Sequence, residues 1–152
     1  MNRRHFLAAL AAATPALALA GPAAAREPRI YTGRFSNLAL QGHDPVAYFS
    51  EGRPVKGERA FQTEHGGAMW RFASEANLDA FSANPVRYAP QYGGYCAWAM
   101  AEGKLAKGDA RFWAVVDGRL YLNFGQDIQD LWDTDRPGFI QRADANWPAI
   151  LV

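Results

Sequence analysis

One cysteine and a few other side chains are the residues of this sequence that could carry chemistry. Cys96 is the only cysteine, and it stands in the stretch QYGGYCAWAM at residues 91–100. Met100 follows four residues later, which places the two side chains on one face if this stretch is helical. Thiolate and thioether groups are the donors that Cu(I) prefers, and an imidazole from His43 or His65 could complete three-coordination. These four side chains form a candidate site for a soft, copper-like metal ion.

Cys96 has two other interpretations. A free cysteine is among the most often buried residues and packs as a small hydrophobic side chain, which suits the neighbouring Ala97 and Trp98. A reactive thiol is the second: if Gly93 and Gly94 turn into a helix, Cys96 lies in its first turn, where the helix dipole favours the thiolate. Because the chain has no second cysteine to resolve an oxidised Cys96, redox chemistry would need a partner thiol. Burial, redox chemistry and metal binding all remain open.

The other polar candidates have simpler explanations. His43 precedes Asp44-Pro45 in a tight turn and fits an exposed turn residue, and His65 precedes two glycines in an expected loop. Asp44 is expected to accept a hydrogen bond from nearby backbone rather than to take part in catalysis. No Ser/His/Asp order, phosphate loop, nucleotide fingerprint or pair of carboxylates is visible. The sequence therefore favours a binding role over an enzyme.

Short elements are expected to position these residues in the first half of the chain. Residues 26–37 predict an extended lead-in. The run AMWRF at 68–72 predicts a strand, because its aromatic and other side chains alternate. Ser74 can then cap a helix that Asn84-Pro85 should end.

The second half contains the clearest local pattern. A short helix is predicted over residues 94–103. The stretch FWAVVDGRLYLNF at 112–124 predicts a hairpin, because two β-rich runs flank Asp117-Gly118, the dipeptide favoured in a type I′ turn. Two amphipathic helices should follow, the second capped by Asp135.

These elements favour an α+β fold. Strands and helices do not alternate strictly, and we expect a small antiparallel sheet, including the hairpin of the C-terminal half, packed with several short helices. The sequence gives no sign of an internal repeat. Aromatic residues make up 13% of the chain, enough for a substantial core in a single domain of this length.

Residues 1–25 predict a cleaved signal peptide. Arg3 and Arg4 precede an apolar, Ala-rich run that ends in small residues. A membrane anchor would need about 20 strongly apolar residues, and Pro15 interrupts this run. The order Arg-Arg-x-Phe-Leu resembles the twin-arginine export signal, which implies a bacterial protein carried folded across the inner membrane. We therefore expect a periplasmic or secreted protein without a stable membrane anchor, whose partners include the twin-arginine export machinery and signal peptidase.

Composition argues against two other classes of protein. The net charge of +1 and the lack of a basic run give no footprint for nucleic-acid binding. A single cysteine excludes an internal disulfide framework, although the expected compartment would permit one.

Several residues, in order, resemble the YHS domain. The resemblance is carried by Asp44-Pro45-Val46, Gly67, Trp70-Arg71-Phe72, Ser74, Phe81, Pro85 and Tyr88. The later stretches YAPQYGGYCAWA and WAVVDGRLYLN are similar to the exported branch of YHS domain-containing proteins. The resemblance implies a single YHS-like domain over residues 26–152.

The same resemblance limits what can be inferred about metals. YHS domains of metal-handling proteins usually carry a cysteine directly after Asp-Pro-Val, where this chain has Ala47. Copper or heavy-metal binding is therefore not implied by the family alone. Some exported relatives have selenocysteine in the Gly-Gly-Tyr-Cys context, which points to chalcogen chemistry at Cys96.

These observations favour an exported, YHS-like small binding module for a soft metal ion or small ligand centred on Cys96. A thiol-dependent redox protein that uses Cys96 with an exported partner is the alternative. A structural interaction domain is the third.

Overall fold

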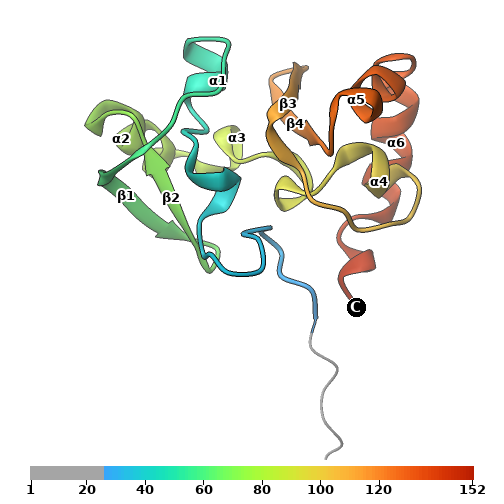
Figure 1. Cartoon of the computed structure of the whole chain (residues 1–152), viewed down its shortest axis with the longest axis horizontal. Coiled ribbons are helices and arrows are strands. Elements are labelled where there is room, and N and C mark those ends of the chain that lie inside the picture. Colours follow the sequence, from blue (N-terminus) through green and yellow to red (C-terminus); the bar gives the residue numbers. More distant parts are fainter. Residues whose placement is uncertain (1–25) are drawn as a thin grey trace, which may run out of the picture.

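The computed structural model describes residues 26–152 and shows short helices around two β-hairpins. The predicted signal peptide, residues 1–25, lies outside the described residues. The first half contains η1 (Ala39–Gly42), α1 (Ala47–Ser50), β1 (Glu58–His65), β2 (Ala68–Phe72), α2 (Glu75–Ala83) and α3 (Pro85–Tyr88). The second half contains η2 (Gln91–Gly94), α4 (Ala97–Ala101), β3 (Asp109–Val116), β4 (Arg119–Asn123), α5 (Gln126–Asp133), α6 (Arg136–Asn146) and η3 (Ala149–Leu151). In Figure 1 the first hairpin lies on the left and the second hairpin, with α5 and α6, on the right.

Each hairpin forms its own two-stranded antiparallel sheet. β1 pairs with β2, and β3 pairs with β4. The predicted α+β class is confirmed, with the antiparallel strands divided between two small sheets. The predicted hairpin is confirmed as well: Asp117 and Gly118 have φ values of 51° and 73°, and a type I′ turn requires positive φ at both positions.

The predicted helix caps are present. The Ser74 hydroxyl accepts a hydrogen bond from the Asn77 N–H at 3.1 Å and begins α2. The Asp135 carboxylate accepts one from the Gly138 N–H at 3.1 Å and begins α6. Each side chain satisfies a donor that the first turn of a helix leaves free, which explains why these sequence signals were reliable.

The two halves repeat one arrangement, contrary to the expectation of no internal repeat. The pairing of Glu58 with Phe72 recurs as Asp109 with Asn123, 51 residues later, and both ladders become irregular at the equivalent step. We call residues 39–88 the first unit and residues 91–146 the second unit. The sequence signal for this repeat is a loop, EGRPVKGE at 51–58 and EGKLAKGD at 102–109. Its brevity between otherwise divergent stretches explains why the repeat is hard to see in the sequence.

The second glycine of each copy of this loop, Gly57 or Gly108, is required for the same structural reason. The Gly57 N–H donates to the Gly42 carbonyl at 2.9 Å, and the Gly108 N–H donates to the Gly94 carbonyl at 3.2 Å. A side chain on Gly57 would overlap the backbone of Arg71, and one on Gly108 would overlap the Gly94 carbonyl. Close backbone approach therefore requires glycine at both positions.

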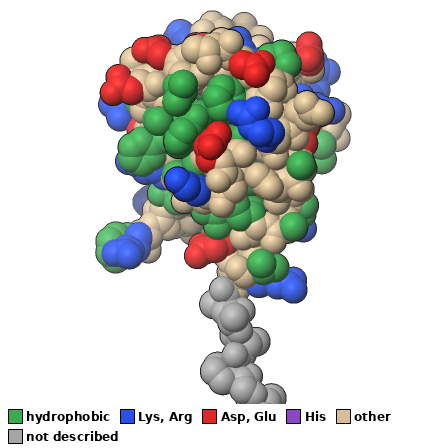
Figure 2. All heavy atoms as spheres, turned by 90° about the vertical axis from the view of Figure 1, so that its right-hand side faces the viewer, with side chains coloured by type: hydrophobic (Ala, Val, Ile, Leu, Met, Phe, Trp, Pro, Cys, Tyr) green, Lys and Arg blue, Asp and Glu red, His purple; other side chains and the backbone are tan. Residues whose placement is uncertain are grey.

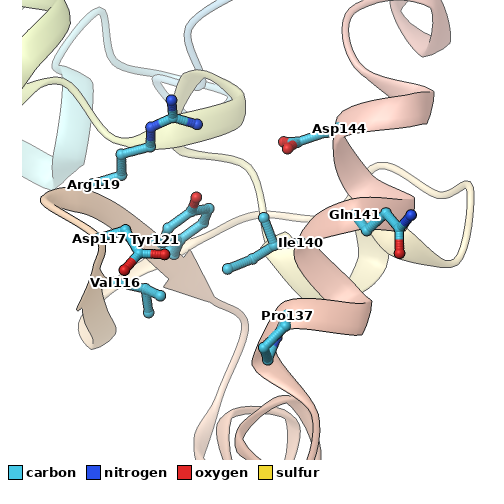
Figure 3. A pocket seen from close by; sticks show the side chains of 8 residues that line it. All are labelled: Val116, Asp117, Arg119, Tyr121, Pro137, Ile140, Gln141 and Asp144. Carbon is cyan, nitrogen blue, oxygen red and sulfur yellow. The ribbon is translucent and has the colours of Figure 1, made fainter.

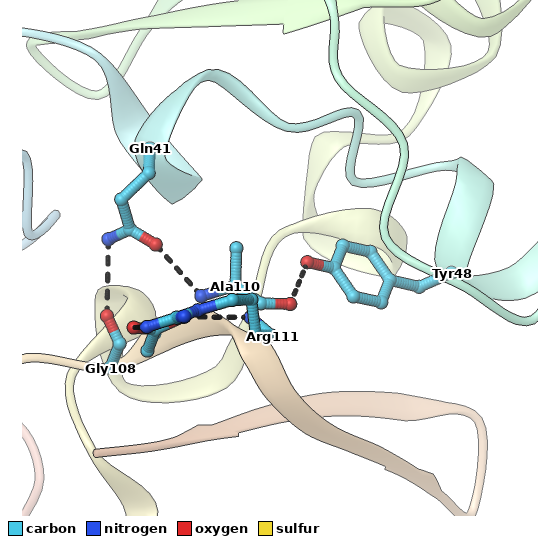
Figure 4. A network of polar contacts seen from close by, with 6 residues as sticks. Gln41, Tyr48, Gly108, Ala110 and Arg111 are labelled. Carbon is cyan, nitrogen blue, oxygen red and sulfur yellow. Dashed lines mark hydrogen bonds and ion pairs between the residues drawn. The ribbon is translucent and has the colours of Figure 1, made fainter. Parts of the chain in front are cut away.

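The two units share packing and polar contacts. The Gln41 amide donates to the Gly108 carbonyl at 3.1 Å and accepts from the Ala110 N–H at 2.8 Å (Figure 4). The Tyr48 hydroxyl donates to the Ala110 carbonyl at 2.6 Å, and its ring packs edge-on against Trp113. One hydrophobic cluster contains buried residues of both units: Ala39, Leu40, Val46, Tyr48, Ala68, Trp70, Phe72, Phe81, Ala110, Leu120 and Leu122. The units are thus joined through the edge of the second hairpin.

A second cluster lies within the second unit and around the C-terminus. Its buried members include Tyr92, Met100, Tyr121, Trp132 and Phe139. None of the helices in residues 26–152 is both long enough and apolar enough to cross a membrane.

Candidate functional site

Cys96 lies at the N-cap of α4, and 0% of its surface is exposed. Its Sγ accepts a hydrogen bond from the Ala99 N–H at 3.5 Å. The same sulfur lies 3.6 Å from Asn123 Oδ1, to which the thiol can donate. The structure agrees with the burial interpretation of Cys96 and gives its thiol a capping role.

The environment of Cys96 favours the protonated thiol. Burial raises the pKa of Cys96, because a thiolate loses its hydration there. The backbone N–H groups of Ala99, Phe124 and Trp98 lower this pKa, but burial outweighs them. The pKa of Cys96 is thus shifted upward, opposite to the lowered pKa that the reactive-thiol alternative requires.

Asp44 has the role expected of it, as an acceptor for backbone N–H groups. Its carboxylate is 0% exposed. Oδ1 accepts from the Val46 N–H at 2.8 Å, and Oδ2 accepts from the Ala73 N–H at 2.8 Å and the Asn77 amide at 2.7 Å. The carboxylate thereby ties the turn before α1 to the end of β2 and to α2.

Cys96 occupies in the second unit the place that Asp44 occupies in the first. The Asp44 N–H donates to the Val55 carbonyl at 2.8 Å, and the Cys96 N–H donates to the Ala106 carbonyl at 2.9 Å. The Asp44 carboxylate then accepts the Val46 N–H just before α1, and the Cys96 sulfur accepts the Ala99 N–H in the first turn of α4. The second unit keeps this backbone arrangement but places a soft sulfur atom where the first places a carboxylate.

A series of hydrogen-bonded polar side chains connects Cys96 to α5. Asn123, 0% exposed, accepts the Trp98 N–H at 3.1 Å through the same Oδ1 that faces Cys96. Its amide donates to Gln129 at 2.9 Å, and Gln129 donates to Asp133 at 3.0 Å. Nothing in the sequence marks Asn123 as a site residue, because an asparagine at the end of a strand carries no distinctive pattern.

The structure divides the predicted metal ligands between the two units. Met100 is 0% exposed and lies in α4, where its N–H donates to the Cys96 carbonyl at 3.0 Å. His43 and His65 belong to the first unit. His43 is half-buried near Leu40, and burial lowers its pKa, with Lys56 contributing in the same direction. His65 is exposed, and it is the last residue of β1 rather than part of the expected loop, which is reduced to the turn at Gly66-Gly67.

Other metal ligands are sparse around this sulfur pair. Within residues 26–152, no three His, Cys, Asp or Glu side chains gather so that they could hold a metal ion. Any metal centred on Cys96 would therefore depend on the thiol and the Met100 thioether.

Comparison with known families matches the YHS domain to residues 46–92. The match covers most of the first unit and ends just before Cys96, which belongs to the second. Comparisons with curated proteins and with solved structures found no match.

Proposed function

We propose that this protein is an exported binding module in which Cys96 and Met100 take up a soft, copper-like metal ion. The observation that carries the proposal is the sulfur pair of α4: a thiol and a thioether, four residues apart, both 0% exposed. Soft ligands of this kind select Cu(I) over harder ions. The YHS domain, a type associated with metal binding, supports the general role.

Metal uptake at this site would require release of the Cys96 proton, because the thiolate is the ligand. Burial raises the pKa of that thiol, so the metal must displace a firmly held proton. The apparent affinity for Cu(I) should therefore rise with pH throughout the range below the thiol pKa.

The burial of both sulfur atoms also bears on how the metal would enter. With Cys96 and Met100 fully covered, loading is easiest while the chain folds. The twin-arginine route, which the N-terminal sequence predicts, exports proteins that are already folded. We propose that the metal is loaded in the cytoplasm, and that residues 1–25 are removed after export to a periplasmic or secreted location.

Burial and a raised pKa disfavour the redox alternative. Reactive cysteines are accessible and partly ionised, whereas Cys96 is covered and its pKa is raised. If the protein proves free of metal, a role as a structural interaction domain becomes the favoured function.

The test is the metal content of the protein after export, isolated without chelator and measured by mass spectrometry. Wild type should carry stoichiometric copper, Cys96→Ser should carry none, and Met100→Leu should lose copper on dialysis. Met69→Leu is the matched control, since Met69 lies in β2 of the first unit. Metal-free wild type, or copper that persists in Cys96→Ser, would overturn the proposal.

A further inference from the structure

A groove lies between the β3–β4 hairpin and α6, and none of its lining residues belongs to the sulfur pair. Its volume is about 450 Å³, within the range of small-molecule sites. Val116, Pro137 and Ile140 supply apolar surface, Asp117 and Tyr121 line the hairpin side, and Arg119 and Asp144 stand on opposite sides (Figure 3). Figure 2 shows the face at the right of Figure 1, where hydrophobic side chains gather next to charged ones.

The two charges across this groove are held apart. The Asp144 carboxylate accepts a hydrogen bond from the Tyr92 hydroxyl at 2.8 Å, which fixes it on the α6 side. Arg119 extends from the start of β4, on the hairpin side. None of the ion pairs found in residues 26–152 includes either residue. Arg119 and Asp144 thus face each other across the groove, and a second carboxylate, that of Asp117, lies on the hairpin side.

The groove is an addition to the repeated architecture. At the position equivalent to Arg119 the first unit has Ala68, which is buried. α3 ends at Tyr88, whereas α6 continues to Asn146, so Asp144 has no counterpart in the first unit. The opposed charges therefore come from features that only the second unit possesses.

We propose that this groove binds a small zwitterion with an apolar side chain, the chemistry of a free aliphatic α-amino acid. The ligand carboxylate would pair with the Arg119 guanidinium, whose planar donors match a carboxylate in a bidentate manner. The ligand ammonium would pair with Asp144, which Tyr92 already orients. The aliphatic side chain would lie against Val116 and Ile140. This assignment is independent of the metal at Cys96.

The test is a titration of the purified protein with L-leucine, followed by calorimetry and by NMR shifts of the groove residues. Arg119→Gln and Asp144→Asn should each weaken binding by about tenfold or more, since each removes one charge-assisted contact. The asparagine variant keeps an acceptor for Tyr92 and should stay folded. Arg142→Gln is the matched control, because Arg142 lies on the same helix but beside Glu102 at 3.8 Å.

Two blocked ligands separate charge recognition from simple apolar contact. N-acetyl-leucine lacks the ammonium group and leucinamide lacks the carboxylate, so both should bind much more weakly than leucine. Cys96→Ser should bind leucine as wild type does, whatever the outcome for copper. Equal binding of leucine and its blocked forms, or no shift of groove resonances at millimolar leucine, would overturn the proposal.

Discussion

Replacement of Asp44 by asparagine tests how much the buried carboxylate contributes to the fold. Oδ2 of Asp44 accepts hydrogen bonds from the Ala73 N–H at 2.8 Å and the Asn77 amide at 2.7 Å. Asparagine replaces one carboxylate oxygen by an amino group, which would face these donors with a third donor. Hydrogen bonds to a charged acceptor contribute about 1.5–3 kcal/mol each, so two lost bonds predict a loss of about 3–6 kcal/mol. Turning the amide over would move the conflict to the Val46 N–H.

Urea denaturation followed by circular dichroism measures this effect as a shift of the midpoint. Asp79→Asn is the control: Asp79 is exposed on α2, and its replacement should change stability by less than about 0.5 kcal/mol. A loss of less than about 1 kcal/mol for Asp44→Asn would refute the reasoning, because removal of a buried acceptor from these donors should lower stability by more than that.

Three further predictions concern the turn, the thiol and the export signal. Gly118→Val should lower the free energy of unfolding by about 1–2 kcal/mol through backbone strain alone, since φ is 73° and no atom lies near its Cβ position. Gly125→Ser is the control, because φ at Gly125 is −170° and the substitution should not change stability. Equal effects of the two substitutions would exclude a type I′ turn. As pH rises above about 9, wild type should lose more stability than Cys96→Ser. The thiol of the unfolded chain releases its proton there, while burial raises the pKa of Cys96 in the folded protein. Parallel stability profiles of the two proteins against pH would show that burial does not raise the pKa of Cys96. Replacing Arg3 and Arg4 by lysine should leave precursor in the cytoplasm, and normal export would contradict the twin-arginine assignment.

The sequence predicted the elements whose signals are local. Asp117-Gly118 between two β-rich runs specified the hairpin, and Ser74 and Asp135 specified the starts of two helices, because each acts on backbone within a few residues. Leu40 shows the limit of such reasoning. It adopts a φ of 54° in η1, which no leucine prefers, and only its buried position in the shared core accounts for this conformation.

The candidate site was less predictable than the fold. Their spacing placed Cys96 and Met100 along one helix, but their burial depends on distant segments. Met100 packs in the second cluster with residues of α5 and α6, and Cys96 lies beside Asn123 of β4. The support from Asn123 and the opposition of Arg119 to Asp144 likewise arise from tertiary packing. The repeat of the two units is visible in the sequence of only one loop. Gly57 and Gly108 stand at equivalent positions of this loop, where the backbone of another segment approaches closely.

The measurement that tests the central claim most directly is copper retention after refolding. Unfolded wild-type protein is refolded anaerobically with Cu(I), desalted and challenged with a Cu(I) chelator, in parallel with protein that receives Cu(I) only after folding. A buried Cys96–Met100 site predicts stoichiometric copper in the first sample, slow or incomplete uptake in the second, and none in Cys96→Ser under either condition. Refolded wild type that retains no copper, or no more than Cys96→Ser, would contradict the account.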